Sequence, residues 1–338
     1  MRVNISRNAV IFLILIAGSL SAQDVHLSMF HVGRLQVNPA LTGMFNGDQQ
    51  MTLIHKSQYF SVDGVDYFTF SGSYDRKFMK SQDQPGFFSG GVIFNYDKSG
   101  DSRLSLGSLS INGSYTRKLA KGIFAGFGAY IGGGQRSFSE ADLTWDNQWN
   151  GSVFDPNLPS GETFDRTNFF FLDMGAGLNL RLQGLDRTKF DLGVGAFHLN
   201  QPGYSFSKQS DITLPIRVSL HGLGVLKLGN FLDLFANGLY QNQDPYTETV
   251  LGGGIILHLS QRKSREVELH LGLATRLDDA LIPMVAIGYD GWRGGFAYDI
   301  NTSAFEAATD GRGGPEFFLT YTLKKLWPFP QTKVCSIF

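Results

Sequence analysis

The chain has 338 residues, a formal net charge of −1 and 17% charged residues, against roughly 25% in ordinary soluble domains. The near-neutral charge provides no broad basic field and argues against nucleic-acid binding. The single cysteine, Cys335, excludes an intrachain disulfide and a metal site built from several thiolates. The 41 Gly and 29 Phe suit strands that face lipid, although a soluble β-sandwich can share this composition.

Residues 1–22 have the three parts of a secretory signal peptide. Two arginines precede an apolar run from Val10 to Ala17, and small residues follow up to Ala22. The apolar run is about half of the roughly 20 residues that a membrane-spanning helix needs. We therefore expect export, with cleavage after Ala22, and a single domain over residues 23–338.

From about residue 50 onward, apolar and polar residues alternate with a period of two. Between Glu266 and Arg276, leucines and a valine occupy every second position, and Glu268 and His270 lie on the other face. The segment has the length of about 9–11 residues that a tilted membrane strand needs. The same pattern recurs around residues 188–199, 293–301 and 316–324.

Many strands that each have one apolar and one polar face need two different environments, one for each face. In a membrane barrel the apolar face contacts lipid and the polar face lines the lumen. Glycines on the polar face, such as Gly193, Gly195, Gly272 and Gly295, leave room for contents of the lumen. We predict an all-β, antiparallel transmembrane barrel of about fourteen strands, near residues 50–60, 65–75, 86–97, 104–117, 121–133, 168–182, 188–200, 213–226, 230–241, 247–259, 266–276, 281–290, 291–301 and 315–325.

Three segments do not resemble spanning strands. They are an N-terminal lead-in or plug at residues 23–47, a long acidic loop at residues 135–167, and a C-terminal tail at residues 326–338. With an even strand count both ends of the barrel lie on one side of the membrane, normally the periplasmic side. A loop of this length is usually functional or disordered.

No motif predicts catalysis. No Gly-x-Ser-x-Gly elbow occurs, and the seven histidines have no metal-ligand spacing. His198 and His270 are interpreted as lumen or rim residues. The acids of the long loop match no calcium-binding template, so a solvated loop is the simpler interpretation. We expect no cofactor, no resident metal and no enzymatic activity.

Several short motifs resemble those of the PorP/SprF family, outer-membrane proteins of type IX secretion and gliding motility in Bacteroidota. Asn38-Pro39-Ala40 with Thr42-Gly43 is similar to the start of the family, with Leu41 in place of a usual Tyr. Further likenesses follow in the family's order: His55-Lys56-Ser57-Gln58-Tyr59, His198-Leu199-Asn200-Gln201-Pro202, Tyr298-Asp299-Ile300-Asn301-Thr302-Ser303, Gly311-Arg312-Gly313-Gly314-Pro315-Glu316 and Cys335-Ser336-Ile337-Phe338, with Ser336 replacing a Pro.

The resemblance implies a non-enzymatic barrel that helps export, receive or anchor particular secreted or surface proteins through their C-terminal signal domains. It also implies contact with the periplasmic ring and peptidoglycan-linked parts of the secretion machine. An outer-membrane porin or uptake channel for small solutes is the alternative, and an outer-membrane enzyme is the third possibility.

Five residues are candidates for partner binding or for plugging the barrel. Asn38 and Pro39 fold into the barrel as a plug or form an ordinary lead-in turn. Arg312 pairs with a lumen carboxylate, Asp299 or Glu316, or lies in a plain hairpin turn formed by Gly311 to Gly314. Trp327 and Phe338 belong to an aromatic tail that suits docking on a partner, or they end a loose terminus.

Overall fold

The computed structural model describes residues 24–59, 67–78, 86–100, 102–140, 143–184, 187–208, 211–262, 265–303 and 306–324. The predicted signal peptide and the C-terminal tail, with Trp327 and Phe338, lie outside the described residues. No helix among the described residues is long and apolar enough to cross a membrane.

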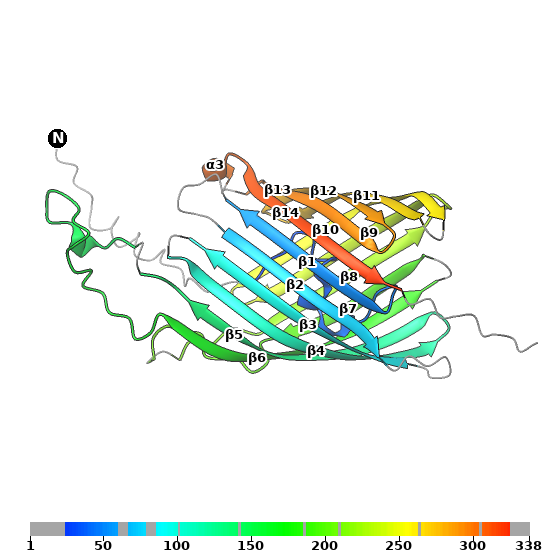
Figure 1. The fold of residues 1–338 in the computed structure, drawn as a ribbon, viewed down its shortest axis with the longest axis horizontal. Coiled ribbons are helices and arrows are strands. Elements are labelled where there is room, and N and C mark those ends of the chain that lie inside the picture. The colour runs from blue at the N-terminus through cyan, green and yellow to red at the C-terminus, as the bar shows by residue number, and fades with distance from the viewer. Residues whose placement is uncertain are drawn as a thin grey trace, which may run out of the picture.

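Fourteen antiparallel strands form one closed barrel in which each strand pairs with its neighbours in the sequence and β1 pairs with β14 (Figure 1). Closure leaves no edge strand with unpaired amides or carbonyls, as hydrocarbon surroundings require. The strands are β1 Gln49–Gln58, β2 Tyr67–Phe78, β3 Gly86–Ser99, β4 Leu104–Ala120, β5 Ile123–Ser137, β6 Asn168–Gln183, β7 Lys189–Phe197, β8 Arg217–Lys227, β9 Leu232–Gln243, β10 Tyr246–Arg262, β11 Arg265–Arg276, β12 Ala280–Tyr289, β13 Trp292–Asn301 and β14 Arg312–Leu323.

The predicted strands agree with the observed ones to within a few residues at most ends, and the predicted fold is confirmed. The largest differences are four residues, at the end of β5, which runs to Ser137 rather than residue 133, and at the start of β8. β8 begins at Arg217 rather than near residue 213, since Pro215 has no amide hydrogen for the ladder. β14 begins at Arg312, so Gly313 and Gly314 lie in a strand and not in the turn that we expected.

The two faces of the wall differ as the alternation predicts. Leu109, Ile111 and Phe127 point outward and are each more than half exposed. Large apolar side chains on the outer face of a barrel contact lipid in the membrane. Lys56, Asp299 and Glu316 point inward and are fully buried. One side of the inner wall is less polar than predicted, because Ile282 and Ala286 of β12 and Ala297 of β13 also point inward and pack in an apolar cluster.

The two ends of the barrel carry connections of different length. The end that we call the long-loop end carries residues 138–167 and 198–216, and the opposite, short-turn end carries tight turns such as residues 121–122 and 290–291. In Figure 1 the β5–β6 loop, coloured green, extends away from the barrel at the long-loop end. Outer-membrane barrels place their longer loops outside the cell.

Residues 24–48, called the N-terminal segment, lie inside the barrel (Figure 1). The segment contains a short helix, α2 (Arg34–Val37), and a 3₁₀ turn, η1 (Pro39–Leu41). It contacts His198 and Arg217 at the long-loop end, and its Asp48 amide reaches the carbonyl of Leu323 at the short-turn end. The segment therefore crosses the lumen lengthwise before β1 begins.

Candidate functional site

The N-terminal segment is the main content of the barrel, so the site is the surface at which it meets the wall. Asn38 is completely buried. Its side chain accepts a hydrogen bond of 2.8 Å from the Ala40 amide and donates one of 2.8 Å to the Leu178 carbonyl. The same side chain therefore caps η1 and anchors that turn to β6.

Glycines on the inner wall make room for Asn38 and Pro39. A Cβ atom added at Gly128 would lie 2.4 Å from the Pro39 carbonyl carbon, and one at Gly177 would lie 2.0 Å from Asn38 Oδ1. An added Cβ would lie 2.8 Å from Asn38 Nδ2 at Gly193 and 2.7 Å from the Val37 carbonyl oxygen at Gly195. These four glycines, from β5, β6 and β7, form what we call the glycine wall.

A buried cluster of charges holds the segment beside β1, β13 and β14. Glu316 accepts hydrogen bonds of 2.7 and 2.8 Å from the amides of Ser28 and Met29. Lys56 Nζ lies 3.2 Å from Asp299 Oδ2 and 3.9 Å from Glu316 Oε2, and it donates to Ser28 Oγ at 2.9 Å. All three charged side chains are at most 1% exposed. Their charges are therefore compensated by the oppositely charged neighbours in the cluster and not by water.

Arg276 extends this cluster toward the long-loop end. Its guanidinium contacts Asp299 at 3.1 Å, Asp279 at 2.8 Å and Glu248 at 2.9 Å. Glu248 in turn lies 2.9 Å from His26 Nδ1. Lys56, Arg276, Asp299 and Glu316 are called the buried charge cluster below. It ties residues 26–29 to four strands of the wall.

His198 binds the start of the segment. Its ring nitrogens lie 2.9 Å from Asp24 Oδ2 and 2.9 Å from Asp173 Oδ1, and Arg217 also reaches Asp24 at 3.3 Å. Burial lowers the pKa of His198, but the two carboxylates outweigh burial and raise it to about 9. Burial raises the pKa of Asp24, but Arg217 and His198 outweigh it and hold that pKa well below its ordinary value.

These pKa directions predict that the His198 tether weakens in alkali. The pKa of His198 is raised from 6.5 to about 9, so the tether contributes fully below pH 6.5 and is lost as pH rises through about 9. Amide hydrogen exchange of residues 24–28, corrected for intrinsic rates, should speed up between pH 7 and pH 10. His198→Asn should exchange fast at both values. An unchanged wild-type protection at pH 10 would argue against the tether.

Apolar contacts hold the same part of the segment as the buried charge cluster. Leu27, Met29 and Phe30 pack with the inner faces of β9 to β14 in one buried cluster. Fully burying side chains of this size stabilises by roughly 1.5–3 kcal/mol each. Apolar packing against the inner wall therefore holds the segment in place, in addition to the buried charge cluster.

Arg312 does not pair with a lumen carboxylate, and that prediction is wrong. Its guanidinium lies 3.6 Å from Asp310, and both side chains are more than half exposed at the rim. Arg312 pairs in register with Ile300, which points outward. Lys56 and Arg276 neutralise Asp299 instead. The β13–β14 register shifts between Asp299 and Ile300, which places Arg312 opposite Ile300 and turns its side chain outward.

The β5–β6 loop is folded on itself. The buried Gln148 side chain donates to the carbonyls of Pro156 and Leu158 and accepts from the Trp145 amide. A bridge between Trp149 and Phe154 closes its end. Trp149, Val153 and Phe154, which we call the hairpin tip, are 57%, 57% and 43% exposed. Within the described residues no group of three His, Cys, Asp or Glu is placed to hold a metal ion.

The family model described as "Type IX secretion system membrane protein PorP/SprF" matches residues 19–321. The chain belongs to the PorP/SprF family. Its fold resembles the toluene transporter TbuX of Ralstonia pickettii, with a TM-score of 0.52 at 11% identity over 86% of this chain and 92% of TbuX. A FadL homologue of Pseudomonas aeruginosa gives 0.48 at 12% identity over 84% and 92%. A search of curated protein sequences finds no significant match.

Family and fold place this PorP/SprF protein in the outer membrane. They point to a secretion or transport membrane protein and not to an enzyme. At 11% identity the likeness to TbuX shows the barrel fold alone.

The motifs that carry the family resemblance meet around the N-terminal segment. Asn38 lies against the glycine wall, Lys56, Asp299 and Glu316 belong to the buried charge cluster, and His198 binds Asp24. Arg276 and Glu248 were missed from the sequence. A signal was present, since each falls on the inward face of an alternating strand. An ionisable residue on a spanning strand points to a buried partner.

Proposed function

We propose that this PorP/SprF protein receives or anchors particular secreted or surface proteins that carry a type IX C-terminal signal domain. The observation that carries the proposal is the N-terminal segment, which fills the lumen from one end to the other. Because the lumen is occupied, the surfaces that remain for binding other proteins are the loops and the two rims of the barrel. Components of the secretion machine on the periplasmic side are the second class of partner.

The hairpin tip supports a protein partner at the cell surface. Its exposed apolar side chains stand on a loop that is held by its own hydrogen bonds and extends beyond the barrel (Figure 1). Between Arg136 and Arg166 the loop contains six acids and no lysine or arginine. Apolar side chains surrounded by acids fit a partner with an apolar pocket and a basic rim.

A solute channel is the competing function, and the lumen argues against it. A pocket between the N-terminal segment and the inner wall from β3 to β8 has a volume of about 70 Å³, which holds only a few water molecules. It is bounded by Asn112, Tyr130 and Asp173 of the wall and by Gln36 of the segment.

Deletion of the gene, followed by proteomics of the surface and the medium, tests the proposal. We expect loss of one or a few large exported proteins with unchanged uptake of small solutes. Unchanged secretion together with slower solute uptake would favour the channel.

A chromosomal Trp149→Ser/Phe154→Ser variant tests the hairpin tip. It should lose the same exported proteins as the deletion, while the barrel still shifts on gels between heated and unheated samples. Ile212→Ser is the matched control, because Ile212 is 60% exposed on the neighbouring loop. If the variant secretes like the control, the hairpin tip is not the recognition element.

A further inference from the structure

The outer wall has a depression where small residues replace large ones. Gly222 and Gly224 of β8, Ala236 and Gly238 of β9, and Gly253 of β10 all fall on the outward face, since His221, Asn237 and other alternate residues point inward and are buried. In register, Gly222 pairs with Gly238 and Gly224 pairs with Ala236. Leucine, isoleucine and phenylalanine occupy most of the surrounding outward positions.

A groove of about 810 Å³ overlaps this depression at Gly224 and Ala236. Its sides are formed by Ile123, Leu182, Phe190, Leu226, Leu234 and Ile255. The Phe190 ring packs over the floor, since a Cβ atom added at Gly224 would lie 3.2 Å from Phe190 Cδ2. The volume is within the range of about 300–1,000 Å³ that small-molecule sites occupy.

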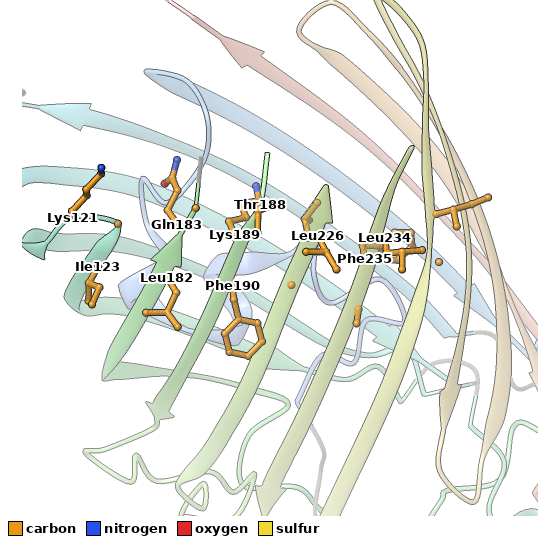
Figure 2. Close-up of a pocket in the computed structure, with 17 residues that line it drawn as sticks. Lys121, Ile123, Leu182, Gln183, Thr188, Lys189, Phe190, Leu226, Leu234 and Phe235 are labelled. Carbon is orange, nitrogen blue, oxygen red and sulfur yellow. The ribbon is translucent and has the colours of Figure 1, made fainter. Parts of the chain in front are cut away.

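One edge of the groove is polar. Figure 2 shows Lys121 and Gln183 along the upper edge, with Ile123, Leu182 and Phe190 pointing away from that edge. This edge is the short-turn end, because Lys121 lies in the β4–β5 turn and Gln183 ends β6. The site is therefore amphipathic, with an exposed cation at one end and apolar side chains below.

The groove lies within one membrane leaflet. Ala236 lies four residues into β9, which at about 3.3 Å per residue is about 13 Å along the strand from the short-turn end. Strands of outer-membrane barrels tilt by about 40°, so this length is about 10 Å along the barrel axis, less than half of the apolar band of about 25 Å.

We propose that this groove binds one phospholipid of the leaflet at the short-turn end, with an acyl chain on the glycine floor and the phosphate at Lys121. The groove opens toward lipid, and a void there would forfeit the dispersion contacts of its lining. An acyl chain is flexible enough to fill it, and a phosphate complements the lysine at headgroup depth. The proposal depends on outer-membrane residence and not on the secretion role.

The test uses the purified full-length chain, delipidated in detergent and titrated with dioleoyl phosphatidylethanolamine, with bound lipids counted by native mass spectrometry. We expect one lipid retained more tightly than the rest. Ala236→Phe, on an exposed outward position, fills the groove and should abolish this retention. Gly113→Phe is the matched control, because its added side chain points outward into open space on β4.

Lys121→Gln tests the contribution of the phosphate to binding separately from that of the acyl chain. It should weaken phosphatidylethanolamine binding about fivefold, the loss expected for one basic residue near a lipid headgroup. Binding of dioleoylglycerol, which lacks the phosphate, should stay unchanged. Equal retention by wild type, Ala236→Phe and Gly113→Phe would overturn the proposal. So would a wild-type dimer that Ala236→Phe dissociates, because the groove would then bind a second copy of the chain.

Discussion

Lys56→Met should destabilise the folded barrel by about 3–5 kcal/mol, the usual cost of removing one partner from a buried ion pair. Asp299 and Glu316 are at most 1% exposed and would lose the cation between them. Arg276 still contacts Asp299, whereas Glu316 would keep only the hydrogen bonds from the amides of Ser28 and Met29, so Glu316 bears most of the cost. Urea unfolding in lipid vesicles, followed by tryptophan fluorescence, measures the loss.

Lys324→Met is the matched control. Its ammonium lies 3.3 Å from Glu266, and both side chains are about half exposed. Exposed pairs of this kind contribute at most about 1 kcal/mol. If Lys56→Met costs no more than Lys324→Met, the buried charge cluster does not hold the N-terminal segment in the way described.

Gly128→Leu should expel residues 36–44 from the glycine wall. The added Cβ would lie 2.4 Å from the carbonyl carbon and oxygen of Pro39. These are backbone atoms, so no rotamer change relieves the clash, and overpacking of a filled interior typically costs 1–3 kcal/mol or more. The barrel itself should still close, because Gly128 keeps its ladder partners Ser114 and Gly177.

Amide hydrogen exchange measures this release. Residues 36–44 should lose protection in Gly128→Leu, while the strands keep theirs. Gly113→Leu is the control on the adjacent strand, where an added Cβ meets nothing within 4 Å. Retained protection of residues 36–44 in Gly128→Leu would mean that the segment does not depend on the glycine wall.

The strands could be predicted from the sequence because one physical constraint repeats along the chain. Every spanning strand needs one lipid-facing and one lumen-facing set of residues, so Leu269 and His270 already indicate their faces. The alternation cannot foresee register shifts. A single shift beside Asp299 turns Arg312 outward, so the alternative in which Arg312 pairs with a lumen carboxylate is wrong.

The contents of the lumen were harder to derive. The sequence predicts a plug or a turn at Asn38-Pro39 and room for lumen contents at Gly193 and Gly195, but no local pattern connects segments so far apart in the chain. Their contact depends on closure of the whole barrel, which brings β5, β6 and β7 around residue 38. Arg276 and Glu248 were missed for the same reason, since their partners His26 and Ser28 lie in the N-terminal segment.

Conductance of the purified wild-type protein in planar lipid bilayers tests most directly whether residues 24–48 fill the lumen. The structure predicts no steady open-channel current, with current steps appearing once Gly128→Leu displaces the segment. A stable, large current through the wild-type barrel, equal to that of Gly128→Leu, would contradict a filled interior and would favour the solute channel.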